Sequence, residues 1–398
     1  MRIALVASKF PPTVGGGESI VYNLARELGK RKHEVTVVTS RLTDTGTNYK
    51  DEILFKVTTM EGFEDFCSGS GNLRSVCQDL YSILYDRHFD IIHVHNFLPM
   101  FVVSQFVNKL SAKIVFTYHN TPNPPQRIMG YFKDFSLDEE FAKNIMNNGS
   151  YDLLLAGSKF YFDWALKLGA NPNKSHLTYF GVDRSRFKPN LTLKKNRIRE
   201  KLGLPKNAFV ITFPSRAIKR KGAIETLHAL SLLKETGFNP VLYMPAFYKP
   251  FDLDFAKSFH QYVKKLNLSE QIYIPDNIIP YEQMPDIYAM SDLVIIPSYY
   301  EGLGLAALEA MSIGIPVIST NVSGINEILK DKYNGILVKP KNASELAKAI
   351  LDLKSNTNLM KNLSSNGKVY VEENFSSSQL IVDIENLYKS LLFKNLPC

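Results

Sequence analysis

Two glutamates, Glu301 and Glu309, have seven residues between them and flank a short glycine-containing segment. The apolar run before them is rich in branched residues and is typical of a strand buried on both faces. Gly302 and Gly304 permit a turn that exposes backbone N–H groups. The helix formers of 305–313 place the positive end of a helix at this turn, where a phosphate binds favourably. Carboxylates accept hydrogen bonds from sugar hydroxyls, so the stretch predicts a site for a sugar carried on a nucleotide diphosphate.

The residues after this helix indicate the same arrangement. Gly314 suits the position just past a helix C-terminus, Pro316 prevents the helix from resuming, and Val317 opens another apolar run. Strand, glycine turn, helix and strand make a βαβ unit, which belongs to a parallel sheet. The alternative interpretation is an ordinary surface glutamate on a turn and another on an amphipathic helix.

The segment that begins at Pro297 follows the pattern P-S-x-x-E-G-x-G-x-x-x-x-E-A-M, which resembles the signature of family 4 of the retaining glycosyltransferases, within the glycosyl transferases group 1. The resemblance spans nearly the whole chain. It implies an α/β chain with the GT-B fold, in which two doubly wound Rossmann-like domains face each other across a cleft. By this resemblance Glu301 contacts hydroxyls of the donor sugar and Glu309 holds the ribose. The turn and the start of the helix also contact the donor, through Gly302, Leu303, Gly304 and Leu305.

A basic segment follows another predicted strand, 208–213, and precedes a predicted helix. It contains Arg216 and Lys221, and a bidentate guanidinium with a point-charge ammonium suits a diphosphate. A solvated basic loop is the alternative. An arginine, four residues and then K-G resembles the family's diphosphate clamp. The resemblance implies that Arg216 and Lys221 bind the donor and neutralise the leaving group during catalysis.

The N-terminal half offers two further candidates. A glycine loop, 15–17, lies between the first predicted strand and a helix start, where its N–H groups could meet phosphate or sugar oxygens. It lacks the spacing of a dinucleotide fingerprint, and a plain flexible turn is the alternative. His119 follows the apolar run 113–118, at the carboxyl end of a predicted parallel strand, where open α/β sheets bind ligands. The resemblance implies that Gly16 and Gly17 belong to the donor site and that His119 lies against the donor sugar near the reacting centre.

Two spacings are of a kind that could hold a metal. His93 and His95 share one face of a predicted strand, but no third ligand is near, so structural histidines are expected. Asp252 and Asp254 form a D-x-D, the metal motif of a different glycosyltransferase fold, but here the acids open a helix and suit its dipole. We therefore expect no metal and no other cofactor, with the nucleotide-diphosphate sugar as substrate.

Two segments that the resemblance places beside the nucleobase depart from the family pattern. Pro245 and Ala246 stand where a glycine pair is usual, and 276–280 lacks the usual glycine. A UDP-sugar is expected in preference to a GDP-sugar, although both departures bear on that choice. The acceptor side is expected in 120–140, with aromatic residues for sugar stacking, lipid contact or ordinary packing at Tyr131, Phe132 and Phe135.

The composition fits this outline. A chain of 398 residues is comfortable for two domains, and its 45% hydrophobic and 22% charged residues are globular values. Three cysteines without a C-x-x-C pair suit a reducing cytoplasm, and no apolar run approaches the roughly twenty residues of a membrane span. The net charge of +8 suits phosphorylated substrates. No nucleic-acid module is evident, and the charge leaves peripheral contact with the inner membrane face open.

We expect an N-terminal acceptor-binding domain over 1–187, a C-terminal nucleotide-sugar-binding domain over 188–373, and a helix over 374–398 that crosses back to the first domain. The expected reaction transfers a hexosyl unit of the glucose, N-acetylglucosamine or mannose type, with retention, to a hydroxyl of a saccharide, lipid-linked or small-molecule acceptor. Cell-surface polysaccharide or glycolipid synthesis is the expected role. The alternatives are synthesis of an antibiotic or other small glycoside, a sugar-nucleotide epimerase of the same fold, and a non-catalytic nucleotide-sugar-binding protein.

Overall fold

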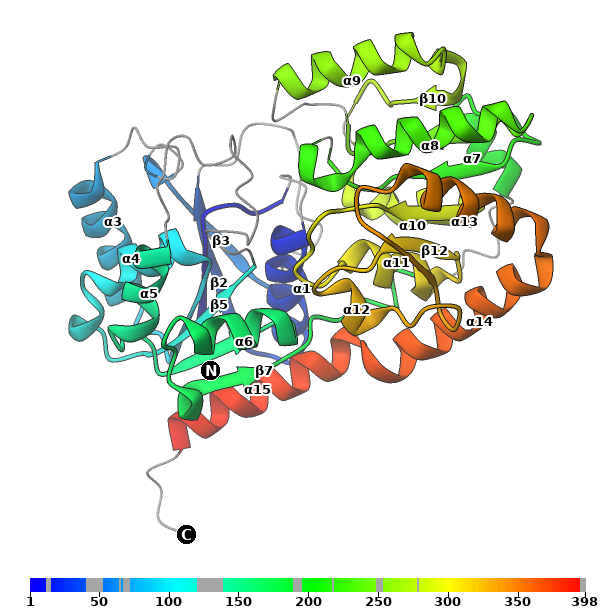
Figure 1. Cartoon of the computed structure of the whole chain (residues 1–398). Helices are drawn as coiled ribbons and strands as arrows, with labels where there is room; N and C mark the ends of the chain where they lie inside the picture. The colour runs from blue at the N-terminus through cyan, green and yellow to red at the C-terminus, as the bar shows by residue number, and fades with distance from the viewer. Residues whose placement is uncertain are drawn as a thin grey trace. The chain divides into compact units, whose positions relative to one another are not determined.

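The chain folds into two compact units, Met1–Phe180 with Ser378–Cys398, and Gly181–Ser377 (Figure 1). The units change over at Phe180 and Ser377, whereas the sequence-based boundaries lie at 187 and 373. The computed structural model describes residues 1–11, 16–40, 53–63, 66, 72–119, 139–188, 195–216, 218–247, 253–277 and 279–393.

The first unit contains a seven-stranded parallel sheet in the order β3-β2-β1-β4-β5-β6-β7. The strand order reverses between β1 and β4, so the sheet is doubly wound and has a topological switch point there. Its strands are β1 (Arg2–Ala7), β2 (Glu34–Ser40), β3 (Lys56–Met60), β4 (Ile91–His95), β5 (Lys113–Tyr118), β6 (Leu153–Ala156) and β7 (Ser175–Leu177). Its helical segments are α1 (Gly16–Lys30), α3 (Leu73–Asp86), α4 (Phe97–Ser104), η1 (Val107–Lys109), α5 (Glu139–Asn147), α6 (Lys159–Lys167), η2 (Pro172–Lys174) and α15 (Ser377–Phe393).

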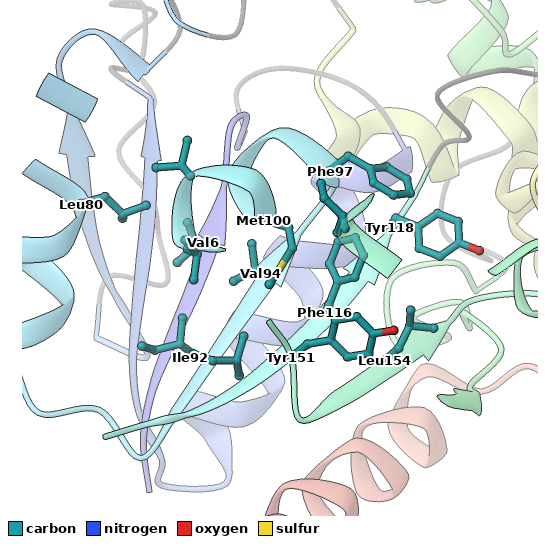
Figure 2. Packing of buried hydrophobic residues seen from close by; sticks show 14 of the residues in the cluster. Val6, Leu80, Ile92, Val94, Phe97, Met100, Phe116, Tyr118, Tyr151 and Leu154 are labelled. Carbon is teal, nitrogen blue, oxygen red and sulfur yellow. The ribbon is translucent and has the colours of Figure 1, made fainter. Parts of the chain in front are cut away.

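One hydrophobic cluster of this unit lies between the central strands and the helices on one face of the sheet (Figure 2). Val94 and Phe116 are fully buried on neighbouring strands, and Phe97 and Met100 of α4 pack against them. Strands buried on both faces read as continuous apolar runs, which is why they were evident in the sequence. The packing fixes the strand ends from which the polar side chains of this unit project.

The second unit contains a six-stranded parallel sheet in the order β10-β9-β8-β11-β12-β13, which reverses between β8 and β11. Its strands are β8 (Val210–Thr212), β9 (Val241–Tyr243), β10 (Ile272–Tyr273), β11 (Leu293–Ile296), β12 (Val317–Thr320) and β13 (Ile336–Val338). Its helices are α7 (Lys195–Lys201), α8 (Ala223–Glu235), α9 (Leu253–Lys265), α10 (Met284–Met290), α11 (Leu305–Ile313), α12 (Ile325–Ile328), α13 (Ala343–Ser355) and α14 (Thr357–Asn374). The described residues of this unit also form the 3-10 helices η3 (Lys219–Lys221), η4 (Ser269–Gln271) and η5 (Tyr281–Gln283).

Two doubly wound Rossmann-like units confirm the predicted fold class. The predicted strand, turn, helix and strand around Glu301 are β11, a turn, α11 and β12, and α11 has the predicted bounds. Gly314 ends α11 in the left-handed conformation, with a φ of 90°. None of the helices in the described residues combines the length and the apolar character needed to cross a membrane.

Candidate active site

The loops that follow β8 and β11 meet at a contact between Lys221 and Glu301. The Lys221 ammonium donates a hydrogen bond to Glu301 Oε1, and the hydroxyl of Ser298 donates to the same oxygen at 2.7 Å. β8 and β11 are neighbouring parallel strands, so their carboxyl ends lie at the same edge of the sheet. This explains how residues 80 positions apart in the sequence become partners.

Burial and charge act against each other in this pair. Burial, together with the nearby charges of Arg220 and Arg216, lowers the pKa of Lys221 to about 8, although Glu301 partly opposes the shift. Burial alone would raise the pKa of Glu301, but the charges of Lys221 and Arg220 and the hydrogen bonds from Lys221 and Ser298 hold it below its ordinary value. The two groups therefore form an ion pair at neutral pH.

Two arginines extend the positive charge around the pair. Arg216 lies on the loop after β8 and is close enough to Lys221 to affect its titration. The charge of Arg220 also lowers the pKa of Lys221, and the Arg220 guanidinium donates to the carbonyl of Tyr300 at 3.2 Å. The spacing in the sequence predicts Arg216 and Lys221 for this site but does not predict Arg220. The positive charges of Arg216, Arg220 and Lys221 can attract an anion such as a diphosphate.

The turn after Glu301 presents the start of α11 to the same edge of the sheet. Gly304 is the N-cap and has a φ of 89°, a conformation that glycine adopts without strain. A side chain there would also meet Ile325, since an added Cβ would lie 2.4 Å from its Cδ1. The amide of Ala307 donates to the Gly304 carbonyl at 2.8 Å, whereas the amides of Leu305 and Ala306 precede the first intrahelical acceptor and suit a phosphate oxygen. Gly302 and Leu303 make up the rest of the predicted turn.

Glu309 lies inside α11 and is held by two tyrosines that the sequence analysis missed. Tyr281 Oη donates to its Oε1 and Tyr288 Oη to its Oε2, both at 2.8 Å. Burial raises the pKa of Glu309 to about 7, although these hydrogen bonds and the charge of Arg186 oppose the shift. Each carboxylate oxygen has a second lone pair, so both can accept a further hydrogen bond. The seven-residue spacing of the tyrosines, two helical turns, is the sequence signal that could have placed them together.

The candidates of the first unit also lie together. His119 directly follows β5, its amide donates to Asn96 Oδ1 at 2.9 Å, and the hydroxyl of Tyr161 donates to its carbonyl at 2.7 Å. Gly16 and Gly17 open α1, and a Cβ at Gly17 would lie 3.3 Å from the His119 ring. The glycine thus permits the close approach of the helix start to the imidazole.

The two strand histidines hydrogen-bond to side chains of their own unit. His93 Nδ1 pairs with Tyr388 Oη at 2.6 Å, and its Nε2 pairs with Thr117 Oγ1 at 2.7 Å. His95 Nδ1 pairs with His119 Nε2 at 3.0 Å. Among the described residues, no three histidine, cysteine or acidic side chains are arranged to hold a metal.

Several predicted positions lie outside the described residues. They are Gly15 of the glycine loop, Asp252 of the D-x-D, and the aromatic residues of the acceptor segment. Asp254 is described, and it lies in the first turn of α9 as the sequence predicts.

Two family models match the chain. The model of Glycosyltransferase Family 4 matches residues 14–186, and the model of Glycosyl transferases group 1 matches residues 194–370, which include the Lys221–Glu301 contact and Glu309. Residues 194–370 are a group 1 glycosyltransferase domain. The resemblance predicted from the residues around Glu301 is therefore confirmed, and the chain is a glycosyltransferase.

Three proteins are similar to this chain over nearly its whole length. N-acetyl-alpha-D-glucosaminyl L-malate synthase of Bacillus anthracis is 24% identical over 390 residues, which cover 96% of this chain and 95% of the relative. Sucrose-phosphate synthase from Thermosynechococcus elongatus has a TM-score of 0.85 at 20% identity, covering 99% of this chain and 100% of that one. HepE of Anabaena, solved with UDP and glucose, has a TM-score of 0.82 at 20% identity, covering 98% and 100%. The two solved structures confirm the GT-B fold of this glycosyltransferase.

Proposed function

We propose that the chain transfers a hexosyl unit, with retention of the anomeric configuration, from a nucleotide-diphosphate sugar to a hydroxyl of an acceptor. The observation that carries the proposal is the contact between Lys221 and Glu301, which joins a cation suited to phosphate and a carboxylate suited to sugar in one buried cluster. In a nucleotide sugar the glycosidic bond joins diphosphate and sugar. A donor bound over this contact therefore has its breaking bond at the cluster.

The positive groups of the second unit are assigned to the diphosphate. Arg216, Arg220 and Lys221, together with the first amides of α11, face the charge that develops as the glycosidic bond breaks. Fixed donors aimed at a developing charge stabilise a transition state more than a ground state. Because these groups supply the neutralising charge, we propose that transfer needs no divalent metal and no other cofactor.

The two carboxylates are assigned to different parts of the donor. Lys221 and Ser298 both donate to Glu301 Oε1, and within the described part of the chain Oε2 has no hydrogen-bond partner. We assign Oε2 to a hydroxyl of the transferred sugar. Glu309 is assigned to the ribose, whose hydroxyls can donate to the lone pairs that the tyrosines leave open. His119 is assigned to the donor sugar near its reacting carbon.

The nucleotide is proposed to be UDP. HepE, which shares the fold, has been solved with UDP and glucose and with UDP-glucose. The name of the Bacillus anthracis relative indicates transfer of an N-acetylglucosaminyl unit. The HepE complexes support a UDP-sugar in preference to a GDP-sugar, and the relative's name supports a hexosyl unit.

The proposed mechanism forms the new bond on the face from which the diphosphate leaves. The acceptor oxygen attacks the anomeric carbon as the bond to the phosphate oxygen breaks, and that phosphate oxygen takes the acceptor's proton. Because the phosphate oxygen takes the proton, no carboxylate is needed as a general base. Glu301 and Glu309 are both assigned to donor hydroxyls. The acceptor is proposed to be a saccharide or lipid-linked hydroxyl in cell-surface polysaccharide or glycolipid synthesis.

The test is a donor-by-acceptor activity screen read by mass spectrometry, with UDP- and GDP-sugars against saccharide, lipid-linked and small-molecule acceptors. We expect a product heavier than its acceptor by one hexosyl residue, formed from a UDP-sugar. Conversion of the donor to an isomer without any acceptor would identify an epimerase instead. Binding of the donor without turnover on any acceptor would identify a non-catalytic binding protein.

A further inference from the structure

Three imidazole rings lie side by side along the carboxyl-terminal half of β4 and just after β5. The ring centroids of His93 and His95 are 4.2 Å apart with an interplanar angle of 29°. Those of His95 and His119 are 5.3 Å apart, and the two rings are nearly parallel at 6°. His95 Nδ1 and His119 Nε2 are 3.0 Å apart, within hydrogen-bond distance. The ring of His119 is therefore hydrogen-bonded to His95, a residue to which the proposed function assigns no role.

The protonation of these rings limits the arrangement to two forms. Burial lowers the pKa of His119 to about 3 and holds that of His95 well below its ordinary value. Both rings are thus neutral near pH 7, and each carries a single N–H. In one form His119 donates to His95, and in the other His95 donates to His119.

The two forms differ in which histidine carries the N–H that has no hydrogen-bond acceptor. His95 Nε2 and His119 Nδ1 are both buried and have no hydrogen-bond partner in the part of the chain that the structure describes. If His119 donated, His95 would carry its hydrogen on Nε2, inside a residue that is only 1% exposed. If His95 donates, the interior nitrogen holds only a lone pair and the unmet N–H is on His119. Each form leaves one buried N–H unmet, but His119 is only partly buried and is a predicted donor-site residue, whereas His95 lies in the interior. A bound ligand can therefore satisfy the unmet N–H only in the second form, which is favoured because orphaned buried N–H groups are rare.

The backbone of His119 is fixed by its neighbours, so the position of the ring hydrogen is what remains to be determined. Its backbone is held on both sides, by Asn96 through the amide and by Tyr161 through the carbonyl. The helix start at Gly17 limits the ring on one face, and Phe180 lies 5.2 Å from it, centroid to centroid. His95 is the side chain that fixes which ring nitrogen of His119 carries the hydrogen.

We propose that His95 is a positioning residue: its Nδ1–H donates to His119 Nε2, which leaves His119 with an Nδ1–H that donates to an oxygen of the transferred sugar. This inference rests on the proposed function in taking the ligand to be the donor sugar. It assigns His119 the role of a neutral hydrogen-bond donor. Neither a general base nor a positive charge is required of it.

The first test is the position of the ring hydrogens, read from one-bond 15N–1H couplings in protein labelled on its histidine rings, without any ligand. We expect the hydrogen of His119 on Nδ1 in the wild type. His95→Phe keeps an aromatic ring but removes the donor, so the His119 hydrogen should move to Nε2. His95→Asn places an amide donor near the original Nδ1 and should restore the wild-type form.

A matched control removes another hydrogen bond of the same histidine group. Tyr388→Phe deletes the partner of His93 and leaves the His95–His119 pair in place. It should lower stability without moving the His119 hydrogen. A wild-type hydrogen on His119 Nε2, or the same position in wild type and His95→Phe, would overturn the inference, and the wild-type spectrum needs no variant to fold.

The second test separates a positioning role from a structural one by steady-state kinetics with the donor found in the activity screen. We expect His95→Phe to lower kcat about 10-fold, the scale of one hydrogen bond, with little change in the donor KM. His95→Asn should recover most of kcat, and Tyr388→Phe should retain it. Equal losses in His95→Phe and His95→Asn would contradict the inference. A hydrogen that moves as expected in a chain that transfers no sugar would support the His95–His119 pair and contradict the proposed function.

Discussion

At the scale of single residues, the site depends on buried charges that are useful because they are only partly compensated. Glu301 offsets the charge of Lys221, whereas Arg216 and Arg220 keep the cluster positive. Burying a charge without a partner costs free energy, so the ion pair with Glu301 stabilises the buried Lys221 ammonium before an anion binds. The same balance makes donor binding sensitive to pH.

Lys221 should make nucleotide binding weaken in alkaline solution. Its pKa of about 8 means that the ammonium loses its proton, and its attraction for a diphosphate, as the pH rises through that value. We expect the affinity for UDP, measured by calorimetry, to fall between about pH 7 and pH 9, where an arginine would stay charged. Lys221→Arg should therefore flatten the dependence. A wild-type affinity that stays constant over this range would show that Lys221 does not bind the diphosphate.

Glu309 should anchor the nucleoside. Glu309→Gln keeps the size of the side chain and an acceptor for one tyrosine but removes the charge. At pH 8, above the carboxyl's pKa of about 7, it should therefore weaken UDP binding by about 1.5–3 kcal/mol, the scale of a charged hydrogen bond. Glu235→Gln, at the exposed far end of α8, is the matched control and should leave the affinity unchanged. Unaltered affinity in folded Glu309→Gln would remove the ribose assignment.

At the scale of elements, the loops after β8 and β11 pack backbone against backbone at Gly222. Gly222 has a φ of 74°, and an added Cβ would lie 2.0 Å from the carbonyl oxygen of Pro297. Tyr299 donates its amide to the Arg220 carbonyl at 2.8 Å beside this contact. Backbone against backbone leaves no flexible side chain to move aside, so this position holds Lys221 against Glu301.

Gly222→Ala should lower the free energy of unfolding by more than the strain of placing an alanine in this backbone conformation accounts for. Gly237 has a similar φ of 83° but nothing within 4 Å of an added Cβ, so Gly237→Ala measures conformation alone, about 1–2 kcal/mol. Gly222→Ala should lose about 2 kcal/mol more, the scale of overpacking. The measurement is the free energy of unfolding of each variant in denaturant. Equal losses in the two variants would mean that the loops yield to the added methyl group.

The elements themselves were largely predictable, and their meeting points were not. Apolar runs and glycine signals predict β11, α11 and β12 because burial on both faces and helix ends act through neighbours in the chain. The pairing of Lys221 with Glu301 depends on which strands become neighbours, which local pattern does not specify. The Tyr281–Glu309 and His95–His119 contacts depend on side-chain reach between separate elements. These partners therefore emerge only from the fold.

At the scale of the whole molecule, the chain combines two doubly wound units with a net charge of +8. We propose that the cations near Glu301 neutralise the leaving diphosphate without a divalent metal. We therefore expect turnover of the UDP-sugar to persist in excess chelator. Complete loss on chelation, restored by manganese or magnesium, would contradict this expectation and bring Asp252 and Asp254 forward as ligands.

The most direct test of the account is the configuration of the product. Proton NMR of the first turnovers, with the UDP-sugar and the acceptor found in the activity screen, reports the anomeric configuration through the coupling of the anomeric proton. The account predicts that the product has the configuration of the donor, because the acceptor attacks from the face that the diphosphate leaves. A product of inverted configuration would contradict the proposed mechanism.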